Sequence, residues 1–202
     1  MRMDEILDCE TFACEDVRKE CYSIPQVRVK PESVRLVMIS EAAPQDIEDT
    51  YYTKGNPLFA QTTVQAFQDA GIEVSSMRDL LKLGVYCTTA VKCGKTGYGI
   101  CAATIKECSN ILEKELDQFG DARVLMLMGD VSIKALNHIA RRAGQKRVIP
   151  AGSTYKIRGE EYSYNGKRVF PSYLQAGPSF FIEKSKRRMI GEDIATAMKL
   201  IA

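Results

Sequence analysis

Residues 84–108 constrain the fold more than any other stretch of the chain. The apolar, β-branched run 85–91 is followed by Lys92, Cys93, a glycine-rich loop and a helix that reaches Cys108. Such a run is apolar enough to be buried on both faces, as the strands of parallel sheets are. Ligands of open α/β sheets bind just beyond the carboxyl ends of these strands. We therefore expect a site around residues 88–93.

The remaining patterns place this strand in a layered fold. Apolar runs predict three further strands at residues 34–39, 124–128 and 169–173, and Asn165-Gly166 predicts the turn of a hairpin within residues 156–169. Helices are expected at residues 4–22, 62–70, 76–83, 102–116, 131–143 and 190–201. Strands that alternate with helices predict a three-layer α/β/α sandwich with a central four-stranded parallel sheet.

The 202 residues fit one domain, 1–202, in which residues 1–30 supply an N-terminal helix and a linker. Ile6, Leu7, Phe12 and Val17 give that helix an irregular apolar face. We find no signal peptide and no apolar run that could span a bilayer, so we expect a cytoplasmic protein without a membrane partner. Seven cysteines in a reducing compartment favour metal binding or catalysis over disulfides.

Four blocks follow one another along the chain: Val-Met-Ile-Ser-Glu-Ala-Ala-Pro at 37–44, Gly-Asn-Pro-Leu-Phe at 55–59, Tyr-Cys-Thr-Thr-Ala-Val-Lys-Cys at 86–93 and Val-Leu-Met-Leu-Met-Gly at 124–129. In this order they resemble the uracil-DNA glycosylase superfamily, and most closely its iron–sulfur branch. A weaker block, Phe-Pro-Ser-Tyr-Leu-Gln-Ala at 170–176, lies where the family has Ile-Pro-Thr-Tyr-His-Pro-Ala. The resemblance covers about residues 14–181 and implies a uracil-DNA glycosylase-like fold.

The resemblance also implies a 4Fe–4S cluster, which needs four cysteine thiolates. The ligands would be Cys14, Cys21, Cys93 and Cys108. The last two match family positions, and the first two would share one side of the predicted N-terminal helix. Cys9 and Cys101 remain alternative ligands, and Cys87 fits the interior of a strand. The competing interpretation is that these thiols are small buried hydrophobes.

Uracil-DNA glycosylases hydrolyse the N-glycosidic bond of a base that is flipped out of the DNA. By resemblance, Glu41 would help to position water, and Phe59, or Leu58, would stack on the base next to Ala42. Thr89 lies where the family uses asparagine to contact the uracil edge. A hydroxyl cannot make the two-point contact of an amide, so the chain departs from the family at this base contact.

The weaker block departs from the family more strongly. Where the family has a histidine that stabilises the departing base, this chain has Leu174 followed by Gln175. Gln175 is our second catalytic candidate, because its amide could donate a hydrogen bond to the base. Loss of one such donor in other enzymes lowers the rate by a factor of about 10²–10³. The single histidine, His138, falls within a predicted helix and is expected to be structural.

Residues 177–181 lie where the family has a loop that wedges into the duplex. Phe180 or Phe181 would fill the gap that the flipped base leaves. Phosphates would be held by Lys184, Lys186, Arg187 and Arg188. The alternative is that these cations form the solvated start of a helix.

We carry three hypotheses forward. The leading one is a monomeric glycosylase that acts on DNA and removes uracil or another deaminated base in base excision repair. The second, favoured by the missing histidine and asparagine, is a catalytically weak or inactive iron–sulfur module of the same fold that binds nucleic acid. The third is a cysteine-based redox or metal sensor, which would have reactive exposed thiols and no affinity for DNA.

Overall fold

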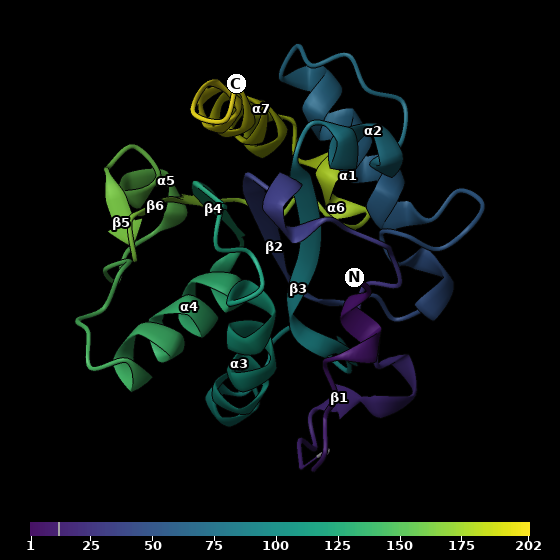
Figure 1. Ribbon diagram of the computed structural model, residues 1–202, viewed down its shortest axis with the longest axis vertical. Helices are drawn as coiled ribbons and strands as arrows, with labels where there is room; N and C mark the ends of the chain where they lie inside the picture. The colour runs from purple at the N-terminus through teal and green to yellow at the C-terminus, as the bar shows by residue number, and fades with distance from the viewer. Residues whose placement is uncertain (12) are drawn as a thin grey trace.

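The computed structural model describes residues 1–11 and 13–202 (Figure 1). Its strands are β1 (Val17–Arg18), β2 (Leu36–Ala43), β3 (Val85–Lys95), β4 (Val124–Met128), β5 (Tyr162–Tyr164) and β6 (Lys167–Ser172). Its α-helices are α1 (Leu58–Asp69), α2 (Met77–Lys82), α3 (Ala102–Leu116), α4 (Asp130–Arg142), α5 (Thr154–Ile157), α6 (Ser179–Ile182) and α7 (Lys184–Lys199). Short 3₁₀ turns occupy Met3–Glu5, Lys19–Cys21, Pro31–Ser33 and Ile47–Asp49.

The strands form one sheet in the order β1-β3-β2-β4-β6-β5. The four central strands run parallel, whereas β1 and β5 pair antiparallel at the two edges. The predicted parallel sheet is therefore confirmed as the centre of a mixed sheet. The predicted hairpin turn is confirmed as well, because Asn165 and Gly166 both have positive φ angles, 47° and 76°, as a two-residue turn of this kind requires.

Alternate residues of the central strands enter two separate cores. In β2, Val37 and Ile39 join the core that α3 and α4 cover, whereas Leu36 and Met38 join the core beneath α1, α2 and α7. Figure 1 shows these two groups of helices on opposite sides of the sheet. Period-two alternation with burial on both faces is what the apolar strand sequences predict.

The N-terminal segment differs from its prediction. In place of a helix over residues 4–22, its described residues form two 3₁₀ turns and the short strand β1, which pairs with Lys95 and Gly94 of β3. Met3, Leu7 and Val17 are buried against the sheet. Contacts with the sheet therefore determine the local conformation of this segment. Phe12, assigned to the apolar face of that helix, lies outside the described residues.

No helix in the described ranges has both the length and the apolar character needed to cross a membrane.

Candidate functional site

A cavity of about 510 Å³ lies at the carboxyl end of β2 and beside the middle of β3, within the region where the strand pattern predicts a site. Its walls come from the middle of β3, the loop between β2 and α1, the start of α1 and the N-terminal segment. The lining residues are Ser23, Pro25, Gln26, Ala43, Pro44, Ile47, Glu48, Thr50, Tyr51, Tyr52, Thr53, Lys54, Phe59, Thr88 and Thr89. We call this space the base cavity. Its mixture of aromatic rings and hydroxyl groups suits a flat polar ring.

Two of the predicted base contacts, Phe59 and Thr89, line the base cavity. Phe59 lies in the first turn of α1, whose start is held because Leu58 donates its N–H to Asp49 at 2.9 Å. Its ring packs at 5.3 Å from the ring of Tyr51, tilted by 57°. Thr89 comes from the buried strand β3. The start of α1 and the middle of β3 therefore present these two side chains to one space.

The other predicted residues at the end of β2 lie outside the base cavity. Glu41 forms an ion pair with Lys95 and accepts the N–H of Val131 at 3.4 Å. Gly129, with φ of 101°, leaves room for Glu41, because a Cβ there would lie 2.6 Å from the carboxylate oxygen. Ala42 is buried in the core that α3 and α4 cover, and its neighbours Ala43 and Pro44 line the cavity instead. Glu41 thus ties β2 to the start of α4.

Gln175 is fully buried behind the wall of the base cavity. Its amide donates to the Tyr51 hydroxyl at 3.1 Å and accepts from Ser40 at 3.2 Å. Ser40 also contacts the Tyr51 hydroxyl directly. Burial raises the pKa of Tyr51 well above its ordinary value, so its hydroxyl stays neutral. Because Ser40 gives its proton to Gln175, the Tyr51 hydroxyl donates to Ser40. Gln175 therefore orients Tyr51, which does line the cavity, and does not face a bound base itself.

Four cysteines line a second, smaller cavity of about 140 Å³ between the N-terminal segment and α3. They are Cys9, Cys14, Cys93 and Cys108. Cys108 accepts the N–H of Lys92 at 3.2 Å, which holds α3 against β3. Burial, reinforced by the neighbouring thiols, raises the pKa of Cys93 to about 12, and burial raises that of Cys108 to about 11.

Cys21 does not line this cavity. Its thiol is buried and donates to the carbonyl of Gln45 at 3.0 Å. Cys87 is buried within β3, and Cys101 is exposed at the start of α3. No three His, Cys, Asp or Glu side chains of the described chain are arranged to hold a metal ion. The four cavity thiols nevertheless match in number and kind what an iron–sulfur cluster needs.

A sequence model of the uracil DNA glycosylase superfamily matches residues 27–189. The chain belongs to the uracil DNA glycosylase superfamily. No curated protein matches it. Among solved structures, a crystal structure of wild-type UNG from Nitratifractor salsuginis is similar, at 13% identity and a TM-score of 0.41, covering 82% of this chain and 74% of that one. Membership of a family that acts on DNA supports a function like that of a DNA glycosylase.

In this superfamily member, the loop predicted to wedge into DNA forms α6. Phe180 is buried, with 2% of its surface exposed, so it cannot serve as the wedge. Phe181 and Ile182 are exposed instead. A wedge must project from the protein surface, so Phe181 is the one of the two predicted candidates that remains.

The basic residues that follow this loop are partly paired with acidic side chains. Arg187 forms an ion pair with Asp69 of α1, and Lys186 forms one with Glu183. Arg188 lies 3.7 Å from Glu192. Lys184 has no ion-pair partner among residues 1–11 and 13–202. The cations available for phosphates are therefore Lys184 and the exposed Arg188, whereas Arg187 mainly fastens α7 to α1.

Sequence reasoning missed a buried polar network next to the base cavity. Lys92 forms a fully buried ion pair with Glu115 of α3 at 2.5 Å, and it donates to the carbonyl of Thr89 at 2.7 Å. Glu115 also accepts hydrogen bonds from Tyr86 and Thr88, at 2.7 and 2.9 Å. The available signal was a lysine in the same apolar strand, because a buried lysine needs a carboxylate partner.

Proposed function

We propose that this chain is a DNA glycosylase that removes uracil or another deaminated base from DNA by hydrolysis of the N-glycosidic bond. One observation supports this most directly: the base cavity, at the carboxyl end of β2 and beside β3, is lined by Phe59 and Thr89. In this proposal the ring of Phe59 stacks on the flipped base, and the hydroxyl of Thr89 contacts its polar edge. Tyr51, held in place by Gln175, adds a second aromatic ring to the wall of the cavity.

The attacking water needs a carboxylate, and Glu48 is better placed for it than Glu41. Glu48 is the single carboxylate among the described residues that line the base cavity. Glu41 lies outside that cavity and is paired with Lys95. Our proposal therefore gives water positioning to Glu48 and a structural role to Glu41. General-base assistance of this kind contributes roughly 10²–10⁴ to a rate.

We further propose that the protein belongs to the iron–sulfur branch and holds a 4Fe–4S cluster. The fitting donors are Cys9, Cys14, Cys93 and Cys108, because all four line one cavity. This set replaces Cys21 by Cys9. The cluster would supply structure, tying the N-terminal segment to β3 and α3. On the DNA side, Phe181 would act as the wedge, and Lys184 and Arg188 would contact phosphates.

A second candidate function is a catalytically weak or inactive module of the same fold that binds nucleic acid. Two observations favour it. Gln175 is buried and does not face the base cavity, and no imidazole is found among the described residues that line this cavity. Such a module would bind DNA with strong salt dependence and release no base.

Base release from oligonucleotides that contain uracil, hypoxanthine or xanthine tests the two candidates. The glycosylase proposal expects release of at least one base, and a rate about 10²-fold lower in Glu48→Gln. Glu41→Gln serves as the matched control and should retain the rate of the folded protein. Absence of release from all three substrates at high enzyme concentration would reject the glycosylase and leave the binding module.

A further inference from the structure

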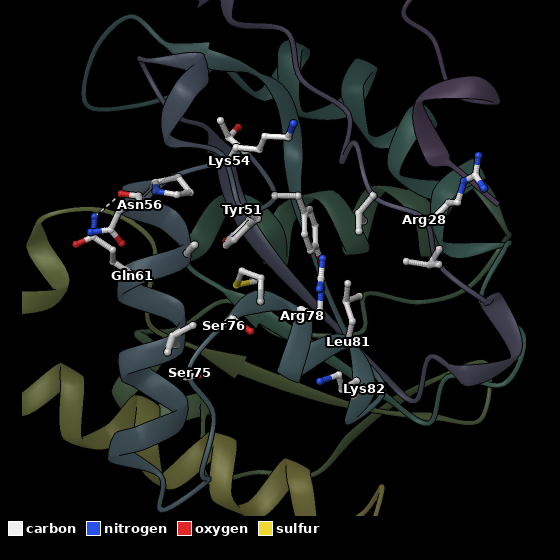
Figure 2. A pocket seen from close by; sticks show the side chains of 18 of the residues that line it. Arg28, Tyr51, Lys54, Asn56, Gln61, Ser75, Ser76, Arg78, Leu81 and Lys82 are labelled. Atoms are coloured by element: carbon white, nitrogen blue, oxygen red, sulfur yellow. Dashed lines mark hydrogen bonds between the residues drawn. The ribbon is translucent and has the colours of Figure 1, made fainter.

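Another hollow, larger than the base cavity and the cysteine cavity, adjoins the base cavity. It measures about 940 Å³ and lies between α1, α2, the loop before α1 and residues 27–34 (Figure 2). We call it the side groove. Neither the base chemistry nor the cysteine cavity described above uses it.

The charged side chains that line the side groove are all cationic. Its cations are Arg28, Lys30, Lys54, Arg78 and Lys82, and no aspartate or glutamate joins them among the described lining residues. All five are exposed. Lys82 pairs with Asp79 at 3.2 Å, whereas the other four have no ion-pair partner in the described ranges. Since the chain as a whole carries a net charge of only +2, this local concentration favours an anionic ligand.

The remaining lining suits unpaired bases. Val64, Met77 and Leu81 give the groove an apolar floor, and the amides of Gln61 and Gln65 come from one face of α1. Figure 2 shows Gln61 and Arg28 on opposite sides of the hollow, with Arg78 between them. Proteins bind single-stranded nucleic acid with cations along the backbone and with aromatic rings on which the bases stack, and Tyr52 in the lining of the groove supplies such a ring.

The side groove and the base cavity share a wall. Residues 51–54 line both spaces. The N-terminal segment also runs past both, because Ser23, Pro25 and Gln26 contribute to the base cavity and residues 27–30 to the side groove. A strand whose nucleotide enters the base cavity can therefore continue into the side groove.

We infer that the side groove binds the single-stranded flank of the DNA whose altered nucleotide occupies the base cavity. This inference rests on the proposed function for the identity of its ligand. The exposed cations hold the flanking phosphates, and the apolar floor receives their unpaired bases. A duplex would keep those bases stacked inside its helix, so the groove favours single strands over double strands.

Fluorescence anisotropy with single-stranded oligonucleotides tests the inference without requiring catalysis. A short uracil oligonucleotide is lengthened on the 5′ or the 3′ side only, and each length is also made with thymine in place of uracil. The wild type should gain affinity from lengthening on one side. The variant Arg28→Ala/Lys30→Ala/Arg78→Ala should lose that gain. Its slope of log affinity against log salt should fall by about 2, given about 0.7 per phosphate contact on a single strand.

Two control variants make the result specific. Arg141→Ala/Lys146→Ala/Arg147→Ala removes three exposed cations at the end of α4, away from the groove lining, and should bind like the wild type. Arg28→Lys/Arg78→Lys keeps the charge and should keep most of the gain. Thermal melting of each variant establishes that it is folded.

The outcomes separate this inference from the proposed function. If base release proceeds but the groove variant keeps the full gain from lengthening, the inference is wrong and the glycosylase stands. If no base is released but the groove variant alone loses the gain, the groove assignment stands and the glycosylase is wrong. An equal loss in the groove variant and in the α4 control would mean that only overall charge attracts DNA, which also overturns the inference.

Discussion

Thr89 offers the base cavity one hydroxyl at the position where the resembling family offers an amide. A side-chain amide donates and accepts at fixed positions, so it can contact two atoms of one base edge. We therefore expect Thr89→Asn to favour release of uracil over hypoxanthine by about 1–3 kcal/mol, a factor of roughly 5 to 150, as a bidentate base contact does. The measurement is the ratio of the two release rates from matched oligonucleotides.

The control for this change is Thr196→Asn on α7, at a threonine that is not part of the cavity lining. It should leave the ratio unchanged. An unaltered ratio in a folded, active Thr89→Asn protein would show that residue 89 does not contact the base.

Lys92 holds the backbone at Thr89 in place: it donates a hydrogen bond to the carbonyl of Thr89 and forms an ion pair with Glu115. Removing one partner of a buried ion pair leaves the other charge without compensation, which typically destabilises a protein by about 3–5 kcal/mol. We expect a loss of this size for Lys92→Met, measured by urea unfolding. The exposed pair of Lys134 and Asp130 gives the contrast, since Lys134→Met should change stability by less than about 1 kcal/mol.

At the scale of single residues, the sequence predicted best the site residues that lie on or next to a regular helix or strand. Thr89 lies on a predicted strand, and Phe59 precedes the helix predicted at residues 62–70. The structure starts α1 earlier, at Leu58, and places both side chains at the base cavity. Glu48, Tyr51 and Tyr52 were missed because they lie in a long polar loop without periodicity. That loop follows long-range contacts, such as the hydrogen bond that the Tyr52 hydroxyl accepts from the N–H of Cys87 at 2.9 Å.

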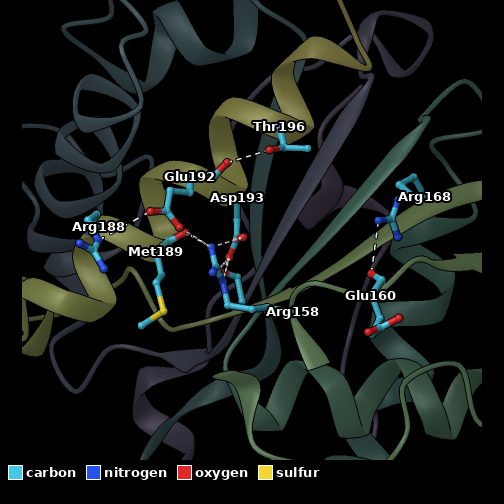
Figure 3. Close-up of polar contacts among 9 residues, drawn as sticks. Arg158, Glu160, Arg168, Arg188, Met189, Glu192, Asp193 and Thr196 are labelled. Atoms are coloured by element: carbon cyan, nitrogen blue, oxygen red, sulfur yellow. Dashed lines mark hydrogen bonds and ion pairs between the residues drawn. The ribbon is translucent and has the colours of Figure 1, made fainter. Parts of the chain in front are cut away.

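Among the elements, α5 and α7 are joined by a clamp centred on Arg158 (Figure 3). Its guanidinium donates to both oxygens of Asp193, at 2.7 and 3.2 Å, and to the carbonyl of Met189 at 2.9 Å. Asp193 also accepts the hydroxyl of Ser172 at 2.5 Å, which ties α7 to the end of β6. Burial raises the pKa of Asp193 by more than its hydrogen bonds lower it.

Because of this clamp, we expect Arg158→Ala to destabilise the fold by an amount that depends on pH. A carboxyl whose folded pKa is raised contributes stability that is present below its unfolded pKa and is lost as pH rises through the folded pKa. Removal of the guanidinium takes away a group that lowers this pKa, so it raises the pKa of Asp193 further. We expect the destabilisation of Arg158→Ala to be smallest in acid and to grow as pH rises toward neutrality, in thermal melts over that range.

The matched control for the clamp is Arg188→Ala on α7, the helix that carries Asp193. Its side chain is exposed and lies 3.7 Å from Glu192, so it should melt like the wild type at every pH. A penalty for Arg158→Ala that is constant from acid to neutral pH would contradict the role given to Asp193.

Elements that are buried on both sides could be predicted from the sequence, and the N-terminal segment could not. The run 124–128 coincides with β4, because five consecutive apolar residues have few alternatives in an α/β chain. Residues 4–22 have helix-compatible composition but pack Met3, Leu7 and Val17 onto the sheet through irregular backbone. Their conformation depends on β3 and α3, about 80 residues away, which local spacing cannot encode.

For the molecule as a whole, the N-terminal segment is held by few regular backbone contacts, since β1 has two residues. Asp16 helps by accepting the N–H of Cys101 at 2.5 Å and the hydroxyl of Thr104. The proposed cluster would add four bonds that join Cys9 and Cys14 to Cys93 and Cys108. Such a crosslink closes a long chain loop and so restricts the unfolded state more than a local contact does.

The proposed set of cluster ligands therefore predicts different outcomes for two single-cysteine variants. Cys9→Ser should lose iron and visible absorbance in anaerobically purified protein and should make the N-terminal segment more sensitive to protease. Cys21→Ser should retain iron, because its thiol donates to Gln45 and lies outside the cysteine cavity. Iron content and limited proteolysis measure both effects without any assay of catalysis. Full iron in Cys9→Ser with loss in Cys21→Ser would reverse the assignment, and iron-free wild-type protein that folds would reject the cluster.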